Sequence, residues 1–164
     1  MPNRPTAVAD ELKQTRPFAT SEEEAIVSVL RSAAVIRRVL GQLIDPFGIS
    51  PAQYNVLRIL RGAGPEGLPT LAVRDRLVEE APGITRLIDK LESATLVRRD
   101  RTGKDRRTVR CHITTAGLAL LAKADAHVRA VQALVSEGIP DEADRLKLIE
   151  LLARLRAAVP TATD

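Results

Sequence analysis

Cysteine and aromatic residues are nearly absent from this chain of 164 residues, which has one Tyr, two Phe, no Trp and a single Cys. One cysteine excludes an internal disulfide framework and is typical of a protein in a reducing compartment. Without aromatic residues, the core must be built from Leu, Val, Ile and Ala. Such a core favours helices, and we expect a mainly α fold.

Long apolar runs and a signal peptide are missing as well. No stretch approaches the roughly 20 apolar residues that are needed to span a bilayer. The N-terminal segment lacks the apolar centre of a secretory signal, so we expect a cytoplasmic protein without a membrane partner. Residues 1–20 hold three prolines and no apolar periodicity, which predicts a flexible arm.

Positive charge is concentrated in one short stretch. Residues 98–110 contain seven basic and two acidic residues, a balance of +5, whereas the whole chain is only +4. The remaining residues, 18 basic and 19 acidic, therefore sum to −1. A patch of this kind suits a polyanion such as nucleic acid. The alternative is a charged surface without a ligand, because charge runs are usually solvated.

The same stretch has the pattern of a two-stranded hairpin over 96–113. β-Prone residues at its start and an alternating run at 108–113 flank a turn at 102–104. The alternation places Arg110 and His112 on outward positions, from which they can project into a groove. We call this hairpin the wing.

Apolar periodicity predicts long helices on both sides of the wing. A Ser-x-x-Glu capping box at 21–24 starts a helix of about 24 residues, which Asp45-Pro46 ends. After the wing, Thr114-Thr115 can cap a third long helix, and 141–159 forms a fourth helical segment. These terminal helices are more apolar than one small domain needs, so we expect them to pair with a second copy.

Shorter helices fill the middle of the chain. A capping box at Ser50–Gln53 opens one helix, and two short ones are predicted at 70–77 and 82–93. The apolar stripe of 82–93 turns five residues away from the core: Gly83, Thr85, Arg86, Asp89 and Lys90. Two short helices followed by a basic hairpin are typical of a winged helix-turn-helix.

The sequence resembles the MarR family of bacterial transcription regulators. The resemblance is carried by TRLIDKLE (85–92), LVRR (96–99), KDRR (104–107) and ITTAG (113–117), and it extends over about 21–159. It implies a homodimeric repressor that binds a pseudo-palindromic operator in double-stranded DNA. A small aromatic or amphipathic effector that releases the operator is a further expectation, and no cofactor is implied.

The resemblance also implies the domain organisation. The expected parts are a flexible arm (1–20), an N-terminal dimerisation helix (21–46), a winged helix-turn-helix module (47–113) with the recognition helix at 82–93 and the wing at 96–113, C-terminal dimerisation helices (114–159) and a tail (160–164).

Candidate site residues follow from the same alignment of motifs. The expected DNA contacts are Thr70, Pro82, Gly83, Thr85, Arg86, Asp89, Lys90, Arg98, Arg99, Arg101, Lys104, Asp105, Arg106 and Arg107. Arg107 is our choice for the side chain inserted into the minor groove, and Asp105 would help to hold the wing arginine. Phe47 and Tyr54 are candidates for an effector pocket, with core packing as the alternative for each.

Three departures from the family pattern stand out. The family commonly has Gly immediately before the wing, where this chain has Thr95, and because a β-branched residue is poor at positive φ we expect the turn to differ by a residue. Ala81-Pro82 replaces the usual Ser or Thr cap of the recognition helix. Val73-Arg74 stands where an apolar residue and alanine are usual, and Arg74 is either a phosphate contact or merely exposed.

Other readings of the sequence compete with a DNA-binding regulator. Cys111 is either a packed strand residue, which we favour, or a redox sensor. His112 and His127 lack neighbours at ligand spacing, so we expect no metal site, and no catalytic motif is present. The rival functions are a sequence-independent architectural DNA-binding protein and a protein-interaction module on the same scaffold. An enzyme is the remotest reading.

Overall fold

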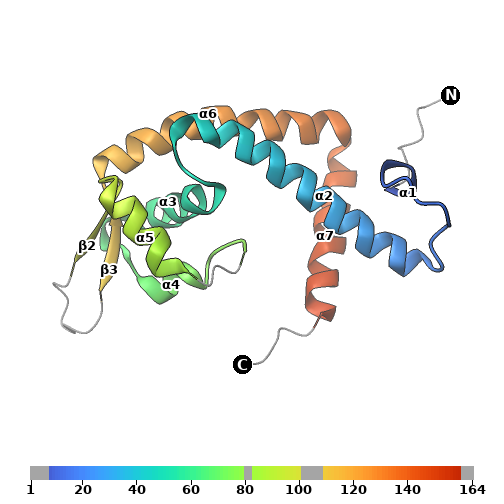
Figure 1. The fold of residues 1–164 in the computed structure, drawn as a ribbon, viewed down its shortest axis with the longest axis horizontal. Coiled ribbons are helices and arrows are strands. Elements are labelled where there is room, and N and C mark those ends of the chain that lie inside the picture. The colour runs from blue at the N-terminus through green and yellow to red at the C-terminus, as the bar shows by residue number, and fades with distance from the viewer. Residues whose placement is uncertain (1–7, 80–82, 101–108, 160–164) are drawn as a thin grey trace.

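The computed structural model describes residues 8–79, 83–100 and 109–159. Two long helices, α2 (Ser21–Ile44) and α6 (Thr115–Gly138), pack against each other (Figure 1). No helix in the described ranges is long and apolar enough to cross a membrane.

The remaining elements gather at the two ends of this helix pair (Figure 1). One end carries what we call the head: α3 (Pro51–Ala63), α4 (Thr70–Arg74), α5 (Ile84–Ser93) and a small sheet. At the other end lie the short α1 (Val8–Glu11) and α7 (Glu142–Ala158). Short 3-10 turns at Asp45–Phe47 and Gly64–Glu66 follow α2 and α3.

Side-chain caps set where the helices begin. The Ser50–Gln53 capping box is confirmed, because the Ser50 hydroxyl accepts from the Gln53 amide at 3.2 Å and the Gln53 carbonyl oxygen accepts from the Ser50 amide at 2.8 Å. The box predicted at Ser21 is wrong by one residue. Thr20 is the N-cap, and its hydroxyl accepts from the Glu23 amide at 3.2 Å. Thr114 and Asp141 cap α6 and α7.

The described part of the N-terminal arm, from residue 8 on, contains a helical turn that the sequence does not predict. We expected no element before residue 21, whereas 8–11 form a helical turn. The Val8 side chain is 7% exposed, and Glu11 pairs with Arg31 of α2 at 3.0 Å. One buried valine and one ion pair are too little to create periodicity, which explains why sequence analysis missed this contact.

The sheet has three strands, one more than the sequence predicts. The predicted hairpin is present as β2 (Val97–Asp100) and β3 (Arg110–Ile113), paired antiparallel. The missed strand, β1 (Leu68–Pro69), pairs with the outer edge of β3 and gives the order β1-β3-β2. A two-residue strand that includes proline cannot show alternation, so no pattern identified it.

Arg110 and His112 do not project outward as the sequence predicts. The Arg110 guanidinium donates to the carbonyl oxygens of Glu66 (2.8 Å) and Gly67 (3.1 Å), and His112 Nδ1 lies 3.1 Å from the Pro65 carbonyl. Both side chains therefore fasten the turn before β1 onto β3. Gly67 has a φ of 58°, and a Cβ there would lie 2.4 Å from the Cys111 carbonyl oxygen, so this close approach requires glycine.

An aliphatic core fills the head, and its members come from every element of it. Val56, Leu57, Leu60, Val73, Ile88 and Leu91 are fully buried and meet Leu121 and Ala124 of α6. Cys111 is also fully buried, which confirms its interpretation as a packed strand residue. The core positions α5 because the exposed face of that helix is fixed once its apolar face is packed.

Thr95 joins α5 to the wing in a left-handed conformation. Its φ is 59°, and the turn is closed by the Leu96 amide on the Leu91 carbonyl (2.9 Å) and the Thr95 amide on the Glu92 carbonyl (2.8 Å). The expected difference of one residue is therefore wrong, because Thr95 itself takes the conformation that the family gives to glycine. The Thr114 hydroxyl donates to the Thr95 carbonyl at 2.7 Å and helps to hold it.

Thr95→Gly is expected to stabilise the protein by about 1 kcal/mol, because a β-branched residue is strained at positive φ while the hydrogen bonds of the turn involve only its backbone. Ala94→Gly is the control and should destabilise the protein, since Ala94 has a φ of −84°. Urea unfolding at one protomer concentration measures both variants. A Thr95→Gly variant less stable than the parent would show that the turn is not strained.

Candidate nucleic-acid interface

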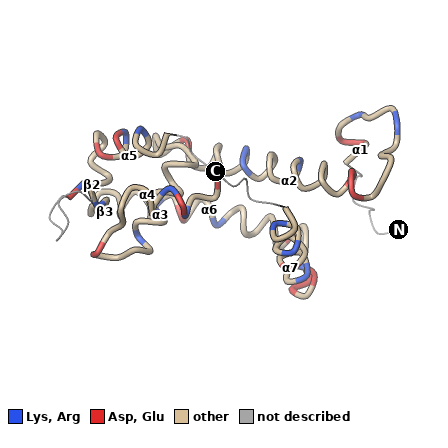
Figure 2. The backbone as a smooth tube through the Cα atoms, turned by 90° about the horizontal axis from the view of Figure 1, so that it is seen from below, with Lys and Arg blue, Asp and Glu red and all other residues tan. Residues whose placement is uncertain are grey.

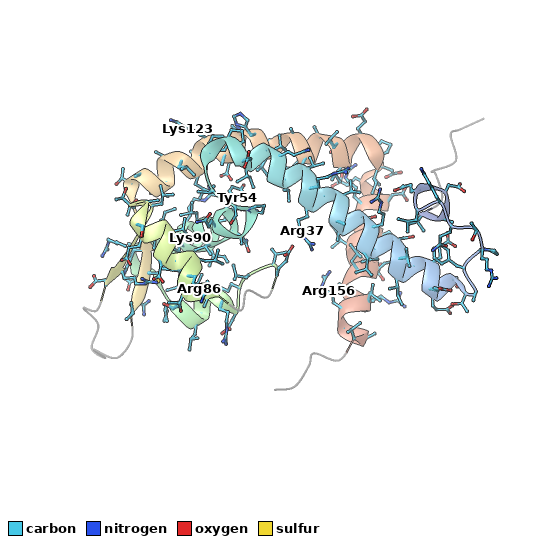
Figure 3. All side chains as sticks on the ribbon, viewed as in Figure 1. Arg37, Tyr54, Arg86, Lys90, Lys123 and Arg156 are labelled. Carbon is cyan, nitrogen blue, oxygen red and sulfur yellow. The ribbon has the colours of Figure 1, made fainter. Side chains whose placement is uncertain are left out.

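The exposed face of α5 is the first part of the candidate interface. Thr85, Arg86, Asp89 and Lys90 are exposed, while Ile84, Ile88 and Leu91 are buried. Gly83 is the N-cap and provides no side-chain cap to the first turn of the helix. Figure 3 shows Arg86 and Lys90 one turn apart on α5, and Figure 2 shows basic and acidic residues side by side along this helix.

Arg99 ties the wing to α5. Its Nη1 atom lies 2.6 Å from Asp89 Oδ1 and 2.8 Å from Glu92 Oε2, and Nη2 donates to the Thr85 carbonyl at 3.3 Å. The Arg99 amide also donates to Glu92 at 3.1 Å. Burial opposes the charge of Arg99, but the hydrogen bond and charge of Asp89, aided by Glu92, raise its pKa further above the ordinary range.

This arrangement changes the roles that the sequence suggested for two residues. Both Arg99 and Asp89 were expected to contact DNA. In the structure they form an ion pair with each other, and the Arg99 side chain is only 23% exposed. The geometry suits a positioning role, in which the pair fixes the angle between α5 and the wing. Arg86 and Lys90 stay available on the surface of the same helix.

The remaining residues predicted to contact DNA have different surroundings, and some of them lie outside the described residues. Arg98 is 56% exposed and pairs with Asp100 at 3.2 Å. Thr70 is half-buried at the start of α4, and its hydroxyl lies 3.6 Å from the Cys111 sulfur. Six predicted residues lie outside the described residues: Pro82, Arg101, Lys104, Asp105, Arg106 and Arg107.

Two contacts that sequence reasoning missed hold the segment leading to α5. The Asn55 side chain of α3 accepts from the Val78 amide at 3.0 Å, and Arg37 of α2 donates to Glu79 at 2.6 Å. These partners are 23 and 42 residues apart, and no motif links them in the sequence. The segment before the candidate recognition helix is thus attached to both the head and the long helix α2 (Figure 3).

The two aromatic residues proposed for an effector pocket occupy different surroundings. Tyr54 lines a pocket of about 260 Å³ between α3 and α6, whereas Phe47 is not part of its lining. Phe47 instead packs edge-on against His127, with ring centroids 5.0 Å apart. Tyr54 is therefore the stronger candidate of the two.

Asp125 organises the floor of that pocket. The Tyr54 hydroxyl donates to Asp125 at 2.5 Å, and Arg61 forms an ion pair with the same carboxylate. Burial, reinforced by this hydrogen bond and the charge of Asp125, raises the pKa of Tyr54 to about 12. Burial works against ionisation of Asp125, but the donors Tyr54 and Arg61 outweigh it and lower its pKa. At neutral pH the pair is a protonated phenol and a carboxylate.

Other candidates for chemistry have ordinary surroundings. Among the described residues, no group of three or more His, Cys, Asp or Glu side chains could hold a metal ion. Arg74 is half-exposed and pairs with Asp75 at 3.2 Å, next to it in the chain.

The head, with a three-helix core, a short sheet and an exposed polar helix face, is a winged helix-turn-helix. Comparison with solved structures extends this to the whole chain. The MarR transcription factor from Planctomyces limnophilus is 35% identical, with a TM-score of 0.63, over 85% of this chain and 99% of that one. The chain therefore belongs to the MarR family of transcription regulators.

Further comparisons agree with this membership. A MarR-family regulator from Silicibacter pomeroyi is 26% identical with a TM-score of 0.70, over 91% of this chain and all of that one. The HTH-type transcriptional regulator YkoM of Bacillus subtilis, itself uncharacterised, is 34% identical over 100 residues, which is 60% of this chain and 64% of YkoM. No family model matches the chain. These relatives are regulators rather than enzymes.

Arg99→Ala is expected to destabilise the protein by about 1–2 kcal/mol, because it leaves Asp89 and Glu92 without their shared partner. Arg98→Ala is the matched control on the same strand. It should cost less than about 0.5 kcal/mol, since exposed ion pairs contribute little. Urea unfolding of both variants is the measurement. Equal stability of the two, with DNA affinity lost only in Arg99→Ala, would make Arg99 a direct DNA contact instead.

Proposed function

We propose that this protein is a homodimeric, sequence-specific DNA-binding repressor whose operator is a pseudo-palindrome in double-stranded DNA. The observation that carries the proposal is the exposed face of α5, with Arg86 and Lys90 on it, next to a wing that holds the excess positive charge of the chain. A helix of this kind fits the major groove, where each base pair presents a distinct pattern of donors and acceptors.

Each group of residues has a role in this proposal. Thr85, Arg86 and Lys90 contact base edges, and Gly83 lets the start of α5 approach the DNA backbone. The wing residues 104–107 enter the flanking minor groove, with Arg107 inserted and Asp105 supporting it. Arg99 and Asp89 position these two arms relative to each other.

Dimerisation is supported by apolar residues that the single chain leaves exposed. α7 has no buried residue, although leucines and isoleucine occupy much of its surface. The exposed fractions are 60% for Leu146, 41% for Leu148, 61% for Ile149, 47% for Leu151 and 40% for Leu155. On α2, Ile26 and Leu30 are 55% and 65% exposed. A second copy that covers these faces also supplies the second α5 that half-sites about 34 Å apart require.

Selection of bound sequences from a random DNA pool tests the proposal against its rivals. A palindromic consensus is the expected result. Binding without enrichment would favour an architectural protein, and absence of DNA binding would favour a protein-interaction module. A small-molecule effector that weakens operator binding remains part of the proposal, with Tyr54 in its pocket, and linkage requires the operator to weaken effector binding equally.

Substitutions of Arg86 and Arg107 are expected to weaken DNA binding in different ways. Arg86→Ala should cost roughly 1–3 kcal/mol on the selected operator and relax preference at one base pair per half-site, because a guanidinium bonds bidentately to guanine. Arg107→Ala should weaken binding to operator and scrambled DNA alike. It should also make the slope of log affinity against log salt shallower by about one unit per wing.

The measurement is a salt series on both variants with both DNAs. Arg154→Ala on α7 is the control and should leave the affinities for both DNAs unchanged. An Arg107→Ala variant with unaltered affinity and slope would remove the wing from the interface, and a silent Arg86→Ala would mean that α5 is misaligned in this proposal.

Leu151→Asp is expected to convert the dimer into monomers and to abolish tight operator binding, since it places a charge in the apolar surface that the second copy would cover. Ala143→Asp is the matched control, with the same charge added to the exposed side of α7 that carries Lys147, Glu150 and Arg154, and should remain dimeric. Sedimentation velocity over a concentration series distinguishes them. A dimeric Leu151→Asp protein would exclude this face of α7 from the interface.

A further inference from the structure

The pocket between α3 and α6 has a lining that the DNA-binding role does not use. Its walls come from these two helices only, and its residues are Tyr54, Arg58, Arg61, Asp125, Val128, Arg129 and Gln132. α3 packs on α6 with one side and on α5 with another (Figure 1). The pocket therefore lies on the side of the head that faces the long helix α6, and Figure 3 shows Tyr54 well separated from Arg86.

Positive charge dominates this lining. Three guanidinium groups face one carboxylate, and that carboxylate is already shared by Tyr54 and Arg61. Within the described parts of the chain, Arg58 and Arg129 form no ion pair or hydrogen bond; Arg58 lies over the Tyr54 ring, with its guanidinium carbon 5.8 Å from the centroid. Arg58 and Arg129, one from each helix, thus border a cavity whose one carboxylate, Asp125, already has two other partners.

The polar groups of the lining determine which chemical class of ligand the pocket can bind. Guanidinium groups bind carboxylate and phosphate oxygens through two parallel hydrogen bonds, and the Gln132 amide adds a further donor. The apolar part of the lining is limited to Val128 and to Tyr54, which is itself 94% buried in the core of the head. An aromatic ring would gain little here, whereas a compact anion would gain two cationic partners.

We propose that the α3–α6 pocket binds a small oxyanion with more than one negative charge, such as a tricarboxylate or a phosphate. This differs from the aromatic or amphipathic effector that the sequence suggests.

Asp125 and its two partners make the site rigid before a ligand arrives. The bonds from Tyr54 and Arg61 hold the floor of the pocket in one arrangement, and a preformed site loses less entropy on binding. The carboxylate of Asp125 repels an anion from this floor. Because Arg61 is already paired with Asp125, the ligand is held between Arg58 on α3 and Arg129 on α6.

An anion in that place would join a helix of the head to a helix of the dimer. Fixing α3 relative to α6 changes how far apart two heads sit, so anion and operator would influence each other's affinity. This consequence rests on the proposed function, whereas anion binding itself does not.

Calorimetry on the full-length protein tests the site at constant ionic strength in chloride. Citrate, inorganic phosphate, benzoate and phenol are the four probes. Saturable binding of citrate or phosphate at one per protomer is expected, with benzoate and phenol at least tenfold weaker. The preference between citrate and phosphate assigns carboxylate or phosphate as the recognised group.

The double variant Arg58→Gln/Arg129→Gln should lower the affinity for the preferred anion at least tenfold. Arg38→Gln/Arg154→Gln, which removes the same charge from exposed positions on α2 and α7, should leave it unchanged. Unfolding midpoints near that of the parent are expected for both variants. Arg58 and Arg129 hold no ion pair within the described residues, and the pair of Arg154 with Glu150 is exposed and contributes little to stability.

Three results would overturn the inference: no saturable binding of either anion, equal loss of affinity in both double variants, or benzoate bound as tightly as citrate through the same two arginines. Operator affinity is measured separately on the same samples. Failure of anion binding with an intact operator complex rejects only this site, and anion binding without any operator complex rejects only the proposed function.

Discussion

The contact of Arg99 with α5 is the interaction on which the geometry of the head depends. The core gives α5 and the wing one attachment, since Ile88 and Leu91 of α5 and Val97 of β2 belong to the same buried cluster. Arg99 adds a second attachment, with two carboxylates and one carbonyl of α5 held by one guanidinium. The planar fork of arginine suits this geometry, and lysine would not reproduce it.

The pairing of Asp89 with Arg99 would reduce what α5 can contact in the proposed DNA complex. Asp89 lies on the exposed face of α5, where an acidic side chain can accept a hydrogen bond from cytosine. Its pairing with Arg99 removes much of that capacity and leaves Arg86 and Lys90 as the charged groups of the face. In the proposed DNA complex, the helix would therefore give up one potential base contact in exchange for a fixed orientation.

α3 connects the head to the long helices through different side chains on different faces. Asn55 holds the segment before α5, Tyr54 reaches Asp125 of α6, and between them the apolar residues of α3 fill the core. Arg37 of α2 reaches the same segment through Glu79. The segment that ends at residue 79 thus has polar contacts with both α3 and α2.

Sequence patterns predicted the parts of this fold that repeat over several residues. The stripe of α5, the caps at Ser50 and Thr114 and the β2–β3 hairpin each involve local spacing, and the structure has them. Contacts between distant residues left no such signal: β1 is two residues long, and the partners of Asp125 are 64 and 71 residues away from it. The outward position predicted for Arg110 was wrong because its side chain binds the carbonyl oxygens of Glu66 and Gly67, in a turn that the hairpin pattern does not include.

Thr95 shows a different limit of prediction. Propensity argues against a β-branched residue at positive φ, and we expected the turn to change. In the structure the turn is unchanged and Thr95 has a positive φ, because two backbone hydrogen bonds and the bond from the Thr114 hydroxyl hold it in this conformation. The glycine that the family commonly has at this position thus indicated the left-handed conformation correctly, whereas the threonine of this chain argued against it.

The C-terminal helix links the stability of one chain to the proposed assembly. α7 has 17 residues, a length at which an isolated helix is weak in water, and none of its side chains is buried within the chain. Its apolar surface supplies a driving force only when another surface covers it. In the proposed dimer, helix formation in α7 and association are therefore one event, and the stability of the protein rises with its concentration.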